Sequence, residues 1–208
     1  MYPPVKCFMV VSTNLVNRKL RRYATIPKGL PPCSAMPGEY SYHNAFVALD
    51  IVPDVRSDRT HEASGYSWPH FDERWPKECA CGYVFKPEDD WQLFCESIWE
   101  SETGEQWTLR DLPPGAMYDA DWIHGRDNWC GEDGKALQVI LPNKHVWHID
   151  GPCINCTRPN DPHKCWVRHG TPPVLTVDKN GNTCSAGGGS IQAEDYHGFL
   201  RDGVLSAG

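Results

Sequence analysis

The clearest chemical feature of the sequence is a pair of cysteines followed by glycine. Cys79 and Cys81 are separated by one residue, and Gly82 lets the backbone turn tightly and aim its amides at the sulfur atoms. This resembles a zinc knuckle, in which two residues usually separate the cysteines. The pair needs two further ligands, which could come from the second group of ligands described next or from three distant candidates: His70, Cys184 and His197.

A second group of metal-ligand residues is compact in the sequence. Cys153 and Cys156 have the usual two-residue spacing of a zinc site, and His163 and Cys165 follow after six intervening residues. We therefore expect one or two structural zinc ions, with disulfides and free thiols as the alternatives. The remaining cysteines lack ligand spacing and are interpreted as core or surface thiols: Cys7, Cys33, Cys95 and Cys130. Serine is accordingly expected to be tolerated better at Cys33 than at Cys156.

The N-terminal sequence favours metal binding over disulfides. No charged segment precedes an apolar run, as it does in secretory signals, and no apolar stretch approaches the ~18 residues of a membrane span. We therefore expect a cytoplasmic protein without membrane contact. In that reducing compartment the ten cysteines stay available for metal.

Charge is distributed unevenly along the sequence. The net charge is −7, yet residues 1–30 hold six bases and no acid, and residues 88–105 hold seven acids and no base. We interpret residues 1–30 as a basic arm on an acidic body. Because an acidic body repels phosphate, nucleic acid could be bound only through the arm. The opposite charges predict self-association, in which the arm of one copy contacts the acidic run of the next.

Composition and turn signals predict a β-rich fold. The 18 Gly and 18 Pro residues exclude long helices, whereas 40% hydrophobic content with nine Trp residues supplies a core. Turn residues recur roughly every ten positions, as between short strands. We expect an all-β fold, or an α+β fold with little helix, in which structural zinc staples short hairpins. A single zinc-binding domain is expected to span residues 31–208.

Several segments carry specific strand or helix signals. One strand is expected within residues 40–52. Hairpins are expected where turn residues separate two apolar runs, in the segments 106–122, 137–149, 174–186 and 196–206. The Asp202-Gly203 pair suits a type I′ turn in the last of these. One short helix is expected at residues 87–97 because Trp91, Phe94 and Cys95 have helical spacing.

Three short motifs follow one another along the sequence: Cys79–Gly82, Ser190-Ile191 and Tyr196–Gly203. Together they resemble a loose family of uncharacterised zinc-binding β proteins encoded in bacterial and tailed-bacteriophage genomes. The resemblance covers about residues 68–206 and implies that Cys79, Cys81 and His197 share one ion. Where that family has a cysteine shortly before the final histidine, this sequence has Glu194 and Asp195. The resemblance implies zinc and a phage setting, and it implies no particular reaction.

The residues favour a structural zinc over a catalytic one. His145 and His148 are three positions apart, so on a strand their side chains point to opposite faces and cannot bind one ion without a bulge. The His-Glu-x-x-His, nucleotide-binding loop and Gly-x-Ser-x-Gly patterns are absent from the sequence. We therefore expect a structural or assembly protein, such as a phage virion component in capsid decoration, connector or tail. The alternatives are a zinc-dependent hydrolase and a cytoplasmic adaptor that binds protein or nucleic acid through residues 1–30.

Overall fold

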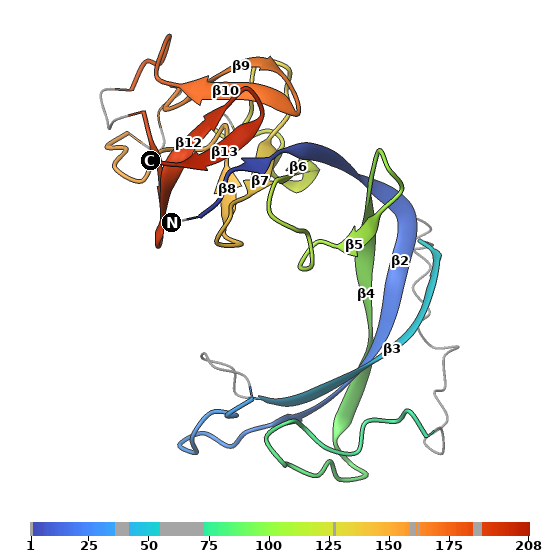
Figure 1. The fold of residues 1–208 in the computed structure, drawn as a ribbon. Helices are drawn as coiled ribbons and strands as arrows, with labels where there is room; N and C mark the ends of the chain where they lie inside the picture. The colour runs from blue at the N-terminus through green and yellow to red at the C-terminus, as the bar shows by residue number, and fades with distance from the viewer. Residues whose placement is uncertain are drawn as a thin grey trace. The chain divides into compact units, whose positions relative to one another are not determined.

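The computed structural model describes residues 2–35, 42–54, 73–126, 128–158, 161, 163–184 and 189–208. Strands make up 47% of the structure, and the part of the chain that is described contains no α-helix. The predicted β-rich fold is therefore confirmed. By its internal contacts the chain divides into two compact units, which can be followed by colour in Figure 1. Unit 1 comprises Met1–Ser12 and Trp99–Gly208, and unit 2 comprises Thr13–Ile98.

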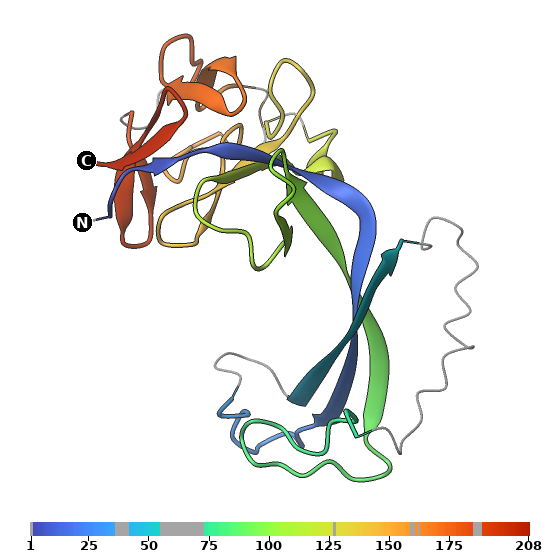
Figure 2. The same cartoon turned by 45° about the vertical axis from the view of Figure 1, so that its right-hand side comes forward.

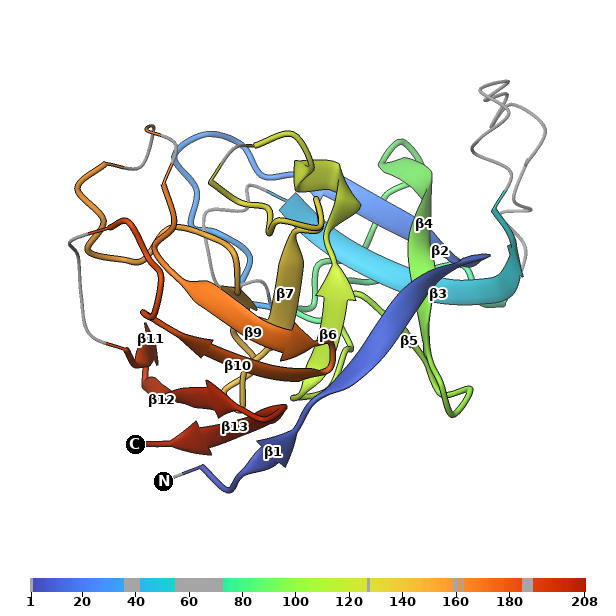
Figure 3. The ribbon, with the colours of Figure 1, turned by 90° about the horizontal axis from the view of Figure 1, so that it is seen from above.

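Unit 1 holds most of the short strands, as Figure 3 shows. One antiparallel sheet has the order β1 (Val5–Lys6), β13 (Val204–Ala207), β12 (Tyr196–Arg201) and β11 (Ile191–Ala193). A separate hairpin is made of β9 (Val167–Thr171) and β10 (Val174–Asp178). The first residues of β2 (Phe8–Thr25) run parallel to β6 (Ala116–Asp119), which is followed by β7 (Leu137–Ile140) and β8 (Val146–His148).

Unit 2 is built on three long strands, two of which continue from unit 1. The chain enters along β2, turns back along β3 (Tyr42–Pro53) and returns along β4 (Asp90–Ser101). Strands β2 and β3 run antiparallel (Figure 2). Their pairing extends from Leu15↔Pro53 to Thr25↔Tyr42, with an irregularity between Arg18 and Lys19. In the sheet order β4 is the neighbour of β2, and β5 (Gln106–Thr108) is the neighbour of β4.

Alternation of side chains explains why β2 is a strand and not an arm. Val16, Leu20, Arg22 and Ala24 are buried, whereas the residues between them are only half-buried. Side chains of a strand alternate between its two faces, so these even-numbered residues share the covered face. Leu20 packs with Trp75 on that face.

The predicted separation of residues 1–30 from the core is therefore wrong. This segment supplies β1 and most of β2, and its Val10, Val16 and Leu20 are 1–3% exposed. Its charges are used within the chain: Arg18 binds Asp50 through two hydrogen bonds, and Lys19 Nζ lies 2.5 Å from Glu96 Oε2. The acidic run does meet the basic segment, but inside one molecule.

Two predicted hairpins are confirmed. Strands β7 and β8 pair antiparallel with Gln138 opposite His148, and β12 pairs with β13. Asp202 and Gly203 have φ angles of 48° and 73°, which the type I′ turn requires at its two central residues. The strand expected within residues 40–52 is also present, as β3.

Other local predictions are wrong because tertiary pairing overrides the local signal. The segment 106–122 is not a hairpin, because β5 pairs with β4, whereas β6 pairs with β2 and β7. Strand β10 pairs with the preceding β9, and the described residues 182–184 of the expected partner segment form no strand. Residues 185 and 186 lie outside the described part.

The predicted helix at residues 87–97 is also wrong, because residues 90–97 belong to strand β4 and residues 87–89 form the turn before it. Phe94 contacts Phe46 and Glu96 contacts Lys19, whereas Trp91 contacts Trp75 on the other face. This two-residue alternation is that of a strand.

Separate hydrophobic clusters hold each unit together. In unit 1, Leu137, Leu141, Leu175, Leu200 and Leu205 belong to one cluster of fully buried side chains. In unit 2, a small cluster contains Ala24, Ile26, Cys33, Cys79 and Phe85. Among the described residues, no helix has the length and apolar character needed to cross a membrane.

Candidate metal centres

The first cluster of ligand side chains lies within unit 2 and contains Cys33, His43, Cys79 and Cys81. One possible ligand atom from each residue lies within 4.8 Å of those of the other three. The Sγ atoms of Cys33 and Cys79 are 3.5 Å apart, and His43 Nδ1 is 3.2 Å from Cys81 Sγ. Three thiols and one imidazole at these separations can surround a single ion, because Cys3His is a common four-ligand set.

Three separate segments bring these four residues together. Cys33 lies in the connection after β2, and His43 lies near the start of β3, opposite Ala24. Cys79 and Cys81 lie in a turn closed by hydrogen bonds from Cys79 N–H to the Tyr83 carbonyl and from Gly82 N–H to the Cys79 carbonyl, each 2.8 Å. Gly82 has φ of +89°, so the turn uses the glycine that the sequence predicted.

The surroundings of the first cluster fix the ring and polarise one thiol. The His43 ring stacks on Tyr83 with centroids 4.1 Å apart and planes 3° apart. Burial raises the pKa of Cys33 to about 11. Burial would also raise the pKa of Cys79, but hydrogen bonds from the backbone N–H groups of Cys81 and Asn44, together with the neighbouring Cys81 and Cys33 side chains, outweigh it and lower that pKa. Cys79 is therefore stabilised as a thiolate, the form that binds metal.

Cys33 and His43 were not predicted from the sequence. Cys33 was interpreted as a thiol without a site, and nothing in its local spacing marks it, since 45 residues separate it from Cys79. Cys33 is recognised as a candidate ligand only in the folded structure, where the pairing of β2 and β3 brings His43 close to it. The candidate His70 lies outside the described residues.

Replacing Cys33 with serine is therefore expected to damage the protein, contrary to the expectation from sequence. Cys33→Ser leaves three donors, so the zinc content should fall by one equivalent and Tm by about 10 °C or more. Cys95→Ser is the control, because Cys95 is half-buried in β4 and belongs to neither cluster. Elemental analysis and calorimetry measure both effects. Equal zinc contents and equal Tm values for the two variants would contradict the assignment of Cys33.

The second cluster lies within unit 1 and contains Cys156, His163, Cys165 and Cys184, whose ligand atoms also lie within 4.8 Å of one another. His163 Nε2 is 3.1 Å from both Cys156 Sγ and Cys165 Sγ. The sequence predicted all four of these residues. Cys184, which was offered as a partner of the Cys79 pair, belongs to this cluster.

Backbone and side-chain hydrogen bonds orient the ligands of the second cluster. His163 Nδ1 lies 2.6 Å from the Asp161 carbonyl, which fixes its proton on Nδ1 and leaves Nε2 free to bind metal. Arg158 N–H points at Cys156 Sγ at 3.4 Å. Both Thr183 and Cys184 donate their backbone N–H to the Lys164 carbonyl, which holds Cys184 beside Cys165. The ligand set is thus supported by a second layer of contacts.

Two other predicted ligands lie differently. Cys153 is not one of the four mutually close donors, although its side chain contacts Cys165. His197 belongs to neither cluster, and its Nε2 lies 2.9 Å from Ser190 Oγ. The structure therefore groups Cys79 and Cys81 with Cys33 and His43 of unit 2, and not with His197 as the family resemblance implied.

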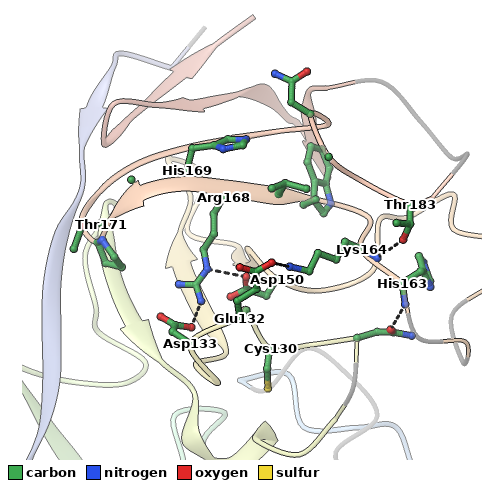
Figure 4. Close-up of a pocket in the computed structure, with 18 residues that line it drawn as sticks. Cys130, Glu132, Asp133, Asp150, His163, Lys164, Arg168, His169, Thr171 and Thr183 are labelled. Atoms are coloured by element: carbon green, nitrogen blue, oxygen red, sulfur yellow. Dashed lines mark hydrogen bonds and ion pairs between the residues drawn. The ribbon is translucent and has the colours of Figure 1, made fainter.

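A cavity of about 930 Å³ lies beside the second cluster and is lined in part by His163 and Thr183 (Figure 4). Its charged groups bind one another. Arg168 reaches between Asp133 and Asp150, with Nε 3.0 Å from Asp150 Oδ1, and Lys164 Nζ lies 2.7 Å from Glu132. These ion pairs attach the segment around Asp133 to β9, the strand that follows Cys165.

Asp150 is expected to give the stability an unusual pH dependence. Burial raises its pKa to about 6, although the neighbouring Arg168 opposes the shift. Because this pKa exceeds the unfolded value, the carboxyl favours folding below about pH 4 and loses that contribution as the pH rises to about 6. As the pH rises from 4 to 7, the free energy of unfolding of Asp150→Asn should therefore increase by on the order of 2–3 kcal/mol relative to that of the wild type. Urea unfolding at several pH values measures the difference.

Asp133 supplies the matched control for this measurement. Its burial would raise its pKa, but the Lys135 backbone N–H and Arg168 lower it overall. Asp133→Asn should accordingly lose stability relative to the wild type at neutral pH, and the loss should shrink as the pH falls through the lowered pKa. The same sign of pH dependence for both variants would contradict the assignment of Asp150.

Comparison with known proteins does not assign either cluster. Searches against protein-family models, curated proteins and solved structures find no match to this chain. The structure itself shows a β-rich protein of two units, each with one Cys3His cluster that could hold a metal ion.

Proposed function

We propose that each cluster binds one zinc ion and that both ions are structural. The observation that carries the proposal is the donor set: each cluster offers three sulfurs and one imidazole nitrogen within 4.8 Å. Sulfur-rich sets favour zinc among the common divalent metals. Four protein ligands complete a tetrahedral shell and leave no position for water or substrate, which distinguishes structural zinc from catalytic zinc.

We further propose that the protein works as a structural or assembly component. Structural zinc stabilises domains with small hydrophobic cores, and the ligands Cys33 and Cys79 are themselves part of the small hydrophobic cluster of unit 2. A protein stiffened in this way acts through its surfaces, so its partners are other proteins, including further copies of itself. A phage virion, with the infected cytoplasm as its place of synthesis, is the setting that the family resemblance supports.

Native mass spectrometry with a zinc count tests both parts of the proposal. We expect two zinc ions per chain and complexes that contain more than one protein chain. Less than about a tenth of an equivalent of zinc, together with mapped disulfides, would overturn the metal assignment. A zinc-loaded protein that stays monomeric at all concentrations and hydrolyses a substrate would overturn the assembly role in favour of an enzyme.

A further inference from the structure

The second cluster has one more thiol than a tetrahedral ion needs. Three other cysteine side chains lie around Cys165, those of Cys153, Cys156 and Cys184, and Cys153 belongs to the same buried cluster as Cys165. Together with His163 these make five donors, of which four form the mutually close group. Since tetrahedral zinc takes four ligands, Cys153 is left beside a ligand without being one.

The position of Cys153 combines close contact with a place beside a cavity. Cys153 is 8% exposed, and its backbone carbonyl accepts a hydrogen bond from the Cys156 N–H at 2.9 Å. This turn holds Cys153 in place. It also lines a second cavity of about 540 Å³, together with Trp147 and Trp166. Cys153 therefore lies at the wall of a cavity, whereas Cys165, 4% exposed, is not among the residues that line it.

The first cluster lacks this arrangement. Its four donors are Cys33, His43, Cys79 and Cys81, and within the described part of unit 2 the only further cysteine, Cys95, lies in β4 and outside the cluster. All three thiols of this cluster belong to the group of four donors, so among the described residues no additional thiol lies beside them. The two clusters thus differ by one thiol that is free of metal.

We propose that Cys153 is an oxidation site that releases the metal of the second cluster, an inference that rests on the proposed zinc occupancy. A peroxide is the oxidant: its O–O bond breaks, an S–O bond forms at Cys153, and one water leaves. The Cys165 sulfur then attacks Cys153, the S–S bond forms, and the oxygen departs as a second water. In sum, two thiols and one hydrogen peroxide give one disulfide and two waters. The ion keeps only Cys156, His163 and Cys184, and its affinity falls.

The test treats the zinc-loaded full-length protein with hydrogen peroxide and follows zinc release with a coloured chelator. In the wild type, one of the two ions should leave at least about tenfold faster than the other. Cys153→Ser should retain both ions before treatment and abolish the fast phase. Cys130→Ser is the matched control, since Cys130 is half-buried, lines the other cavity and lies outside both clusters. Mass mapping should find a Cys153–Cys165 disulfide in the wild type.

Each contrary result has a distinct meaning. A Cys153→Ser protein that carries one zinc ion would make Cys153 a ligand and overturn the inference. So would a fast phase that survives this substitution, or a disulfide that excludes Cys153. A wild type without any zinc would overturn the proposed function instead. In that protein a peroxide-dependent Cys153–Cys165 disulfide would still support the thiol pair, and its absence would overturn that too.

Discussion

Removal of zinc by an excess of a strong chelator is expected to lower Tm by about 20 °C or more. Structural zinc contributes on the order of 10 kcal/mol of apparent binding free energy, and each kcal/mol shifts Tm by about 2–4 °C in a protein of this size. The effect should be largest in unit 2, where Cys33 and Cys79 are both ligands and members of a small core cluster. Circular dichroism measures Tm, and hydrogen exchange locates the loss. An unchanged Tm after complete removal of metal would contradict a structural role.

Single-site variants separate the two ions in the same experiment. Cys79→Ser and Cys156→Ser should each retain one zinc equivalent. The protection of amide hydrogens should fall first in unit 2 for Cys79→Ser and first in unit 1 for Cys156→Ser, because each unit holds all four ligands of its own ion. Restoring zinc to the chelated wild type should restore both patterns. Loss of both ions from either variant would indicate one coupled site and not two.

Features encoded by neighbouring residues could be predicted from the sequence. The β7–β8 and β12–β13 hairpins were recognisable because two strands and their turn lie within a few residues of one another. The second metal cluster was recognisable for the same reason, since Cys156, His163 and Cys165 lie in one short proline-rich loop. In both cases the spacing alone limits which atoms can meet.

Features that depend on long-range pairing could not be predicted in this way. Cys33 and His43 meet Cys79 only because β2 and β3 pair in a register that sets His43 opposite Ala24. Strand β4 has the apolar spacing of a short helix, and its pairing with β2 decides its conformation. A local pattern cannot specify a register between segments that are dozens of residues apart.

The basic segment shows how a correct electrostatic argument gave a wrong location. The opposite charges of residues 1–30 and 88–105 do attract, as the contact of Lys19 with Glu96 shows. Arg22 is 6% exposed and donates to the carbonyls of Pro76 and Lys86, so it is part of the interior of unit 2. Burial of apolar residues between these bases, and not their charge, fixes the segment in the sheet.

Paired substitutions within this segment decide whether it is a strand of the core or an arm. Leu20 is 1% exposed and packs with Trp75, whereas Leu30 is 60% exposed. Leu20→Asp buries a carboxylate without a partner and should cost more than about 4 kcal/mol, enough to unfold unit 2, while Leu30→Asp should stay within about 0.5 kcal/mol of the wild type. Deletion of residues 1–30 should likewise prevent folding at any salt concentration, because it removes the strand that joins β3, β4 and β6. Urea unfolding and the zinc count measure the outcome. A deleted protein that folds with two zinc ions would return these residues to an arm outside the core.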